Sequence, residues 1–425
     1  MGDAVGRALN NDPVYLGAQA DLGISKAQSS QAFAALMPKL SASVSTTKNR
    51  RDYFQTPIGG TPSNILETYN SDSAQLNLTQ PLWHLDNYYG MRQADYVVEQ
   101  SDQKLLSAGQ DLLVRLAQTW FDILQARDAL SLGESKLSLA KYQLDQAVKS
   151  NEKGAMSITD KELAHGKYEL ARAEQNGAEA ALRAKFAALE EIIGPLEKEE
   201  LPDVSGDIAI PEHGDSSLKY WLKLVGEHNP SIWAARYALD AANEEVHKQY
   251  AGHEPTLDIV ASYGKSSQGA GLTGGQAGFS AKTNSVGLQL NVPLFAGGGQ
   301  VAKVREADAK KEKTMEDLKL AERNARLSTK QAWFMWLSSE TMQMAARQNM
   351  RSTAFALKGA EAERARGIGS ELDVLKAKVE FDGATRDFRK AQYDSFLAYF
   401  KLLAMAGRLT GNDLMRLDHL TRMRR

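Results

Sequence analysis

The sequence predicts a mainly α-helical protein that contains two copies of one structural repeat and four β-strands suited to a membrane barrel. Three observations carry this prediction. Residues 82–194 and 294–425 contain no proline and are rich in residues that favour helices. Landmark residues recur along the chain at a nearly constant spacing. Four short segments alternate apolar and polar side chains, the pattern of a strand with two different faces.

Each proline-free window predicts two long antiparallel helices that meet at a glycine. Gly154 and Gly367 lie in weakly apolar stretches, where we expect the hairpin tips. A continuous helix from Trp83 to the first tip would contain about 70 residues and be roughly 105 Å long. The predicted hairpins cover residues 84–194 and 298–407.

The landmarks indicate a duplication. Two early proline pairs are 217 residues apart, and three later pairs are 213 apart, as a change in loop length between them would produce. These pairs are Pro13 with Pro230, Pro38 with Pro255, Trp120 with Trp333, Gly154 with Gly367, and Gly194 with Gly407. We predict a first repeat over residues 1–212, a second over 213–425, and a linker or equatorial region over 195–216.

Each repeat is expected to hold two strands, and the four predicted strands are residues 39–48, 73–82, 256–264 and 284–294. Their polar positions carry mainly Ser, Thr, Asn and Gln, as in strands that separate lipid from a wet lumen. Four strands cannot close a barrel, and an open strand edge cannot face lipid. Three chains would pool twelve strands, an even number within the range of known barrels.

The composition excludes several classes of function. The chain has 51 Lys and Arg against 53 Asp and Glu, and a net charge of −2 argues against a nucleic-acid partner. The absence of cysteine excludes disulfides, thiol nucleophiles, cysteine-ligated zinc and a lipid-modified N-terminal cysteine. The seven histidines show no metal-binding spacing, and no enzyme motif is present. The sequence begins without a basic and then apolar segment, so any signal peptide is expected to be missing or removed.

An ordered set of short motifs resembles the TolC family of bacterial outer-membrane ducts. Two motifs resemble the family's helix starts, N-D-P-V-Y-L at 11–16 and H-N-P-S-I at 228–232. Two resemble its strand-to-helix junctions, Q-P-L-W at 80–83 and V-P-L-F-A-G-G at 292–298. Two resemble its helix tips, G-A-M-S-I-T-D at 154–160 and G-I-G-S-E-L-D-V-L at 367–375. The set follows the family's order in both repeats and spans nearly the whole chain.

The resemblance implies a homotrimer with a twelve-stranded barrel in the bacterial outer membrane and a long α-helical barrel in the periplasm. It implies a passive exit duct that is no enzyme, has no cofactor and contacts outer-membrane lipid. Its expected partners are a periplasmic adaptor (membrane fusion) protein and an inner-membrane ABC or RND transporter. The chain looks most similar to a type I protein-secretion member, and the lack of an N-terminal cysteine favours that branch over lipid-anchored drug-efflux ducts.

Two alternative functions remain open from the sequence. A multidrug efflux duct would share the whole fold. A soluble helical scaffold protein would explain the long hairpins, but it would leave the four paired strands unexplained.

By resemblance, Asp160 and Asp373 match acidic positions near the family's periplasmic constriction. Three copies of each would form a negative collar that favours cations. The alternative is that Thr159, Asp160 and Ser370 only cap the two returning helices.

The second tip departs from the family pattern at the residues that would lock such a gate. Lys376 stands where the family has a second acid, Gly369 where it has an arginine, and Arg364 where it has a tyrosine. We therefore hypothesise that Arg364 or Arg366 acts against Asp160 as a substitute lock.

Two further groups of residues are candidate contact sites. The tip glycines Gly154, Gly367 and Gly369 are expected where an adaptor or transporter would make contact. Trp83 and Phe295 each follow a strand-ending proline by two residues. They fit an aromatic girdle at the membrane interface, and they fit equally a packing role at the strand-to-helix bend.

Overall fold

The computed structural model describes residues 2–56, 59–196, 217–270 and 278–415. The elements in chain order are α1 (Gly2–Asn11), α2 (Pro13–Ala34), β1 (Lys39–Gln55), β2 (Ser63–Trp83), α3 (Leu85–Glu152), α4 (Ile158–Ile193), α5 (Leu218–His228), α6 (Pro230–Ala251), β3 (Thr256–Gln268), β4 (Phe279–Asn291), α7 (Gly299–Ala365) and α8 (Glu371–Met405). The predicted linker over 195–216 lies, apart from its first two residues, outside the described residues.

The described residues fall into two compact units. The first, which we call the hairpin unit, lies within Met1–Leu22, Ser101–Ala235 and Leu318–Arg425. The second, the sheet unit, lies within Gly23–Gln100 and Arg236–Asp317 and holds all four strands. Among the described residues, no helix has an apolar stretch long enough to cross a membrane.

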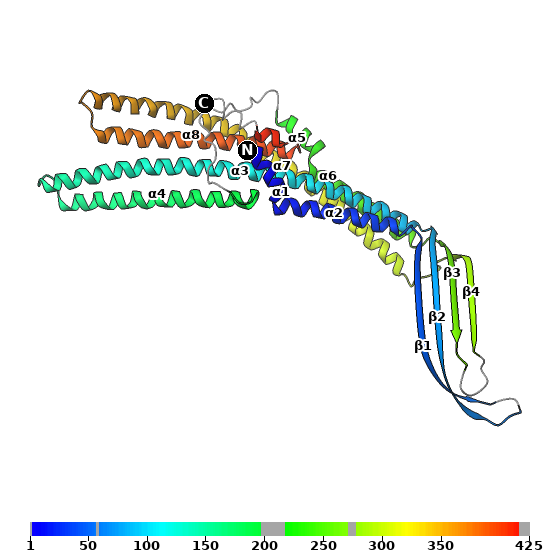
Figure 1. Ribbon diagram of the computed structural model, residues 1–425. Helices are drawn as coiled ribbons and strands as arrows, with labels where there is room; N and C mark the ends of the chain where they lie inside the picture. Colours follow the sequence, from blue (N-terminus) through cyan, green and yellow to red (C-terminus); the bar gives the residue numbers. More distant parts are fainter. Residues whose placement is uncertain (1, 57–58, 197–216, 271–277, 416–425) are drawn as a thin grey trace. The chain divides into compact units, whose positions relative to one another are not determined.

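The two long helical hairpins form as the proline-free windows predict. Helix α3 runs for 68 residues and α7 for 67, and each turns back into a shorter partner, α4 or α8 (Figure 1). A helix of 68 residues is about 100 Å long at 1.5 Å per residue. No proline interrupts any of these four helices, so every interior amide can donate along the helix.

The two hairpins of the hairpin unit pack against each other through α3 and α8. The Arg389 guanidinium pairs with the Asp128 carboxylate, and the Ser135 hydroxyl donates to the Asp382 carboxylate over 2.5 Å. The rings of Phe121 on α3 and Tyr393 on α8 stack with centroids 5.3 Å apart. The core around this contact also takes side chains from α1 and α4. A second buried cluster joins α5 and α6 to α7 and α8, with Trp336 fully buried at its centre, as its helical spacing predicts.

Each repeat contains a helix that begins at an Asx-Pro pair. Asp12 caps α2 by accepting from the Tyr15 amide at 2.8 Å, and Asn229 caps α6 by accepting from the Ile232 amide at 3.0 Å. The following proline occupies the first helical position, where its missing N–H costs nothing. Burial raises the pKa of Asp12, but hydrogen bonds from Arg115 and the Tyr15 amide outweigh this effect, so the pKa lies below its usual value. The Asx residues of the two Asx-Pro pairs are therefore buried helix caps.

In each repeat, a glycine follows the returning helix and packs against the residues next to the Asx-Pro helix start. Gly194 and Gly407 have φ values of 77° and 63°, which side chains rarely tolerate. A Cβ on Gly407 would lie 2.8 Å from the His228 carbonyl oxygen. A Cβ on Gly194 would lie 3.3 Å from the side chain of Asn11. The end of each helical hairpin thus packs closely on the start of its own repeat.

The sheet has the order β1-β2-β3-β4, with every neighbouring pair antiparallel. Its register places one set of apolar side chains on a single face: Leu40, Ala42 and Val44 on β1, Leu76 and Leu78 on β2, Ile259, Ala261 and Tyr263 on β3, and Val286, Leu288 and Leu290 on β4. Serine pairs occupy the other face, with 2.8 Å between the hydroxyls of Ser45 and Ser73 and 2.7 Å between those of Ser262 and Ser285. This confirms the predicted alternation.

The strands differ from the predicted segments at their ends. At the loop side, β1 continues past the predicted end at 48 to Gln55 and pairs with β2, which begins at Ser63 and not at 73. The backbone ladder continues there although apolar and polar side chains no longer alternate along the strands, so the hydrophobic pattern did not predict it. β3 and β4 extend likewise to Gln268 and from Phe279. At the other side, β4 ends at Asn291 and not at 294, because Pro293 has no N–H for the ladder.

A methyl group at the two equivalent glycines should have unequal effects. Gly407→Ala places its Cβ against a backbone carbonyl at a positive φ, whereas Gly194→Ala meets only a side chain that can move. The positive φ alone costs alanine about 1–2 kcal/mol, so both variants should lose stability, and Gly407→Ala should lose clearly more. Thermal unfolding of the two purified variants measures the difference. Equal midpoints would contradict the close contact at His228.

Candidate gate at the helical tips

The first tip is a glycine turn between α3 and α4. Gly154 has a φ of 70°, and the Ala155 amide donates to the Ser150 carbonyl over 2.9 Å, which closes the end of α3. A Cβ on Gly154 would meet nothing within 4 Å, so its backbone angle, not space, favours glycine here.

The second tip is tighter. Gly367 has a φ of 78°, and the amides of Ile368 and Gly369 both donate to the Glu363 carbonyl over 3.1 Å. A Cβ on Gly369 would lie 2.9 Å from the Glu363 Cβ and 3.0 Å from the Arg364 nitrogen. No side chain fits at Gly369 unless the end of α7 moves. The turn of this chain therefore does not accommodate an arginine at position 369.

Both predicted gate acids stand three residues after a capping serine. Asp160 donates its amide to the Ser157 hydroxyl over 3.1 Å, and that hydroxyl donates to the Asp160 carboxylate over 2.9 Å. Asp373 and Ser370 make the same pair of contacts, at 3.2 Å and 2.5 Å, and the Ser370 amide also reaches the carboxylate. The expected cap at Thr159 is wrong, because Ser157 caps α4, whereas Ser370 caps α8 as expected. The repeated S-x-x-D pattern is the signal that would have identified both caps.

The caps leave both carboxylates exposed. Hydrogen bonds from the Ser370 side chain and amide hold the pKa of Asp373 below its usual value, and the positive charge of Lys376 adds a smaller lowering. The Asp373 carboxylate is consequently ionised throughout the neutral range. Capping and a negative charge at the tip are compatible, since the cap itself favours the ionised acid.

The two arginines of the second tip, Arg364 and Arg366, differ in their ion-pair partners. The Arg364 Nε lies 2.5 Å from a carboxylate oxygen of Glu371, which joins the end of α7 to the start of α8. Within one chain, Arg364 is thus engaged by its own tip and Asp160 by Ser157. Arg366 is exposed, and its side chain has no ion pair in the described part of the chain. The sequence reasoning did not identify Glu371 as a partner.

The two tips meet at a small cleft. Asp160 lines a cleft of about 360 Å³ together with α3, α4 and Leu372 of the second tip. Ile158 and Ile368 are 69% and 76% exposed at the ends of the two hairpins. Each tip thus exposes a large apolar side chain.

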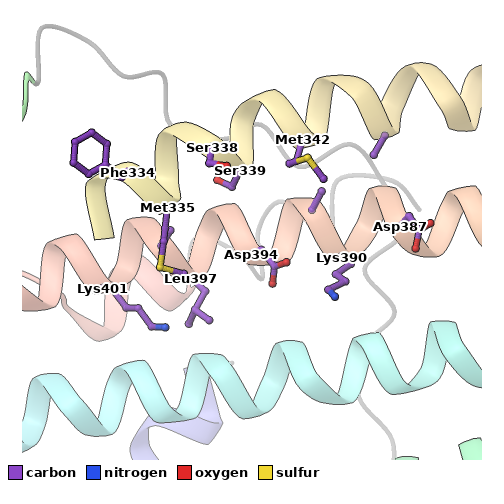
Figure 2. A pocket seen from close by; sticks show the side chains of 13 residues that line it. Phe334, Met335, Ser338, Ser339, Met342, Asp387, Lys390, Asp394, Leu397 and Lys401 are labelled. Atoms are coloured by element: carbon purple, nitrogen blue, oxygen red, sulfur yellow. The ribbon is translucent and has the colours of Figure 1, made fainter. Parts of the chain in front are cut away.

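A larger cavity of about 770 Å³ lies between α7 and α8 of the hairpin unit (Figure 2). Helix α7 contributes Phe334, Met335 and Met342, and α8 contributes a stripe of charged side chains. Burial raises the pKa of Asp394 above its usual value, although Lys390 opposes this effect. The sequence did not predict this cavity, because it is formed by positions on two helices about 50 residues apart. In the described residues, no group of three or more His, Asp or Glu side chains is arranged to hold a metal ion.

The two candidate girdle aromatics lie at the junctions of the sheet unit. A bulge after Pro81 brings Trp83 opposite Leu257, which places it on the apolar face of the sheet. Its side chain is about half exposed. Phe295 follows the end of β4 and is also exposed. Neither ring is buried at the bend in the single chain, and the interface role stays a prediction.

The chain was compared with known proteins. A family model described as outer membrane efflux protein matches residues 4–195 and 221–408. The alkaline protease secretion protein AprF of Pseudomonas aeruginosa is 29% identical over 408 residues, which cover 96% of this chain and 84% of AprF. The proteases secretion protein PrtF of Dickeya chrysanthemi is 27% identical over 354 residues, 82% of this chain and 75% of PrtF.

Among solved structures, the CmeC outer membrane channel of Campylobacter jejuni superposes with a TM-score of 0.77 at 18% identity, and the match covers 99% of this chain and 88% of CmeC. This likeness shows that the folds agree. The proteins of the matched family are transport ducts, not enzymes, with a barrel in the outer membrane and a helical tunnel in the periplasm. Because the family model matches most of the chain, in two ranges, this protein belongs to the outer membrane efflux protein family.

Proposed function

We propose that this protein is the outer-membrane exit duct of a type I protein-secretion system. The observation that carries the proposal is the nearly full-length similarity to AprF, whose name assigns it to alkaline protease secretion. PrtF, which is named for the secretion of proteases, supports the same function, and its similarity covers 82% of this chain. In this function the chain performs no chemistry and supplies a continuous passage.

A single chain cannot form that passage. Among the described residues, β1 pairs only with β2 and β4 only with β3, so both outer strands have an unpaired edge. Unpaired backbone groups are too costly to face lipid, and closure requires further strands. Three copies supply twelve strands, and a trimer is the norm in this family. We propose the homotrimer for this chain on that basis.

The hairpin unit supplies a second argument for assembly. Leu163 and Leu170 on α4 are exposed, as are Met342 and Phe355 on α7. These helices are the outer members of the two packed hairpins, because α3 and α8 contact each other. In the proposed trimer, α4 of one chain covers α7 of the next and closes the helical wall. The apolar side of the cavity between α7 and α8 would then face a neighbouring chain.

Channels of this family work with a periplasmic adaptor and an inner-membrane transporter in tripartite systems. For this chain we propose an ABC transporter rather than an RND pump, in keeping with protein secretion. The tips with Gly154, Gly367 and Gly369 would receive the adaptor, and the exposed Ile158 and Ile368 supply apolar contact area there. The chain's contact with lipid would be made by the apolar face of the sheet.

We further propose that the two tip acids form the periplasmic gate. In a trimer, Asp160 and Asp373 each become a ring of three carboxylates, which favours the passage of cations. Lys376 lies within a turn of Asp373 and moderates that charge. Arg366 is the arginine left to reach Asp160 of a neighbouring chain, since Arg364 is paired with Glu371.

A capping role and a gating role of the two tip aspartates predict different ion selectivities for the channel. Trimers carrying Asp160→Asn and Asp373→Asn should lose most of their cation preference in planar bilayers, because the carboxylate charge at the pore mouth is removed. The control variant, Ser157→Ala with Ser370→Ala, removes the caps at about 1 kcal/mol each but keeps the carboxylates, so its selectivity should be unchanged.

The pH dependence adds a check. Because the pKa of Asp373 lies below its usual value, the contribution of Asp373 to the cation preference should persist as the pH falls through the range in which a free aspartate titrates, and should weaken only below that range. If the serine variant changed selectivity as much as the aspartate variant, the acids would act as caps alone and the gate proposal would fail.

Deletion of the gene distinguishes secretion from drug efflux. We expect a specific protein to disappear from the culture medium, while drug sensitivity stays near the wild-type level. Restoring the gene should restore the extracellular protein. An unchanged set of secreted proteins together with a marked gain in drug sensitivity would favour the multidrug efflux alternative.

A further inference from the structure

Two lysines face each other across the β3–β4 pair. Lys265 and Lys282 are direct partners in the register, and both side chains are exposed. Like charges directly opposite each other on neighbouring strands destabilise a sheet. Neither lysine forms an ion pair with an acidic side chain among the described residues. An arrangement that costs stability in the isolated chain suggests that an anion from outside compensates it.

The lysine pair lies on the apolar face of the sheet. Side chains alternate along a strand, so Lys265 points to the same face as Tyr263, two residues before it. Leu257 to Tyr263 make up the apolar stretch of β3, seven residues or about 23 Å, close to the height of a lipid-facing band. The pair therefore lies directly beyond the apolar stretch, on the side of the β3–β4 loop.

Further basic residues share this face on β1. Lys48 and Arg50 continue the alternation that begins with Leu40 and Val44, and both are exposed. Two acids, Asp52 and Asp72, also lie on this face beyond the band, which leaves two net positive charges per chain. Closure of the proposed trimer would place β4 of one chain beside β1 of the next, so the basic residues of neighbouring chains would form one ring.

We propose that Lys265 and Lys282, supported by Lys48 and Arg50, bind the phosphate groups of anionic lipid at the loop end of the barrel. A lysine next to an apolar band can lay its methylene chain along the lipid and place its ammonium group at headgroup level. Phosphates are concentrated at that level, and an anionic surface attracts each nearby lysine with an effect of about fivefold on binding. The proposal rests on the sheet facing lipid and is independent of the cargo.

The experiment compares lipid retention by purified trimers. The trimer is reconstituted into vesicles of phosphatidylcholine alone, or of phosphatidylcholine and phosphatidylglycerol in equal amounts, and is then extracted in detergent. Native mass spectrometry counts the lipids that remain bound. The wild type should retain phosphatidylglycerol preferentially at low salt and lose this preference at high salt. Lys265→Gln with Lys282→Gln should reduce the preference about fivefold for each lysine removed.

Three controls keep the outcome decisive. Lys39→Gln removes one positive charge from the polar face at the other end of β1 and should leave the preference unchanged, whereas removing either lysine of the pair should lower it. Lys265→Arg with Lys282→Arg should retain it. Flotation with pure phosphatidylcholine vesicles tests separately whether the sheet enters lipid, and a failure there would overturn the barrel itself. If the glutamine variant floats normally and retains as much phosphatidylglycerol as the wild type, the lysines do not bind lipid phosphate and the proposal is wrong.

Discussion

The backbone of the two outer strands sets the main constraint on this protein. β1 and β4 each present a row of N–H and C=O groups that no other described residue of the chain pairs. In water such an edge is tolerable, but in a membrane it must be covered. The apolar face of the sheet requires lipid, and the edges require more strands. Both needs are met when identical chains close one barrel, and that closure also determines which helices become neighbours in the tunnel wall.

The same residues recur in both repeats because the same backbone problems recur. In each repeat, an Asx side chain (Asp12 or Asn229) caps a helix that begins with proline. A glycine with a positive φ, Gly194 or Gly407, follows the end of another helix and packs against this helix start. At each tip, a glycine turns the chain and an S-x-x-D box starts the return. At the second tip, Asp373 stabilises the helix start and keeps its charge. A structural requirement thus supplies the charged groups that we assign to the gate.

Sequence reasoning predicted the parts of the fold that depend on local chemistry. Proline-free windows and period-two alternation located the four long hairpin helices and the apolar parts of all four strands. They missed the loop-side extension of the β1–β2 hairpin, because apolar and polar side chains do not alternate in that part of the two strands. They also missed the pairing of Arg364 with Glu371 and the lysines opposite each other on β3 and β4, since these contacts depend on a tight turn and on strand register.

The most direct test of this account is the detergent-corrected mass of the protein extracted from outer membranes. One chain has a mass of 46.6 kDa, so a closed trimer should give a protein mass of about 140 kDa. That result would agree with a barrel that pools the strands of three chains. A stable monomer or dimer that needs no detergent would contradict it, because its strand edges would be unpaired or paired in another way and no continuous duct would form.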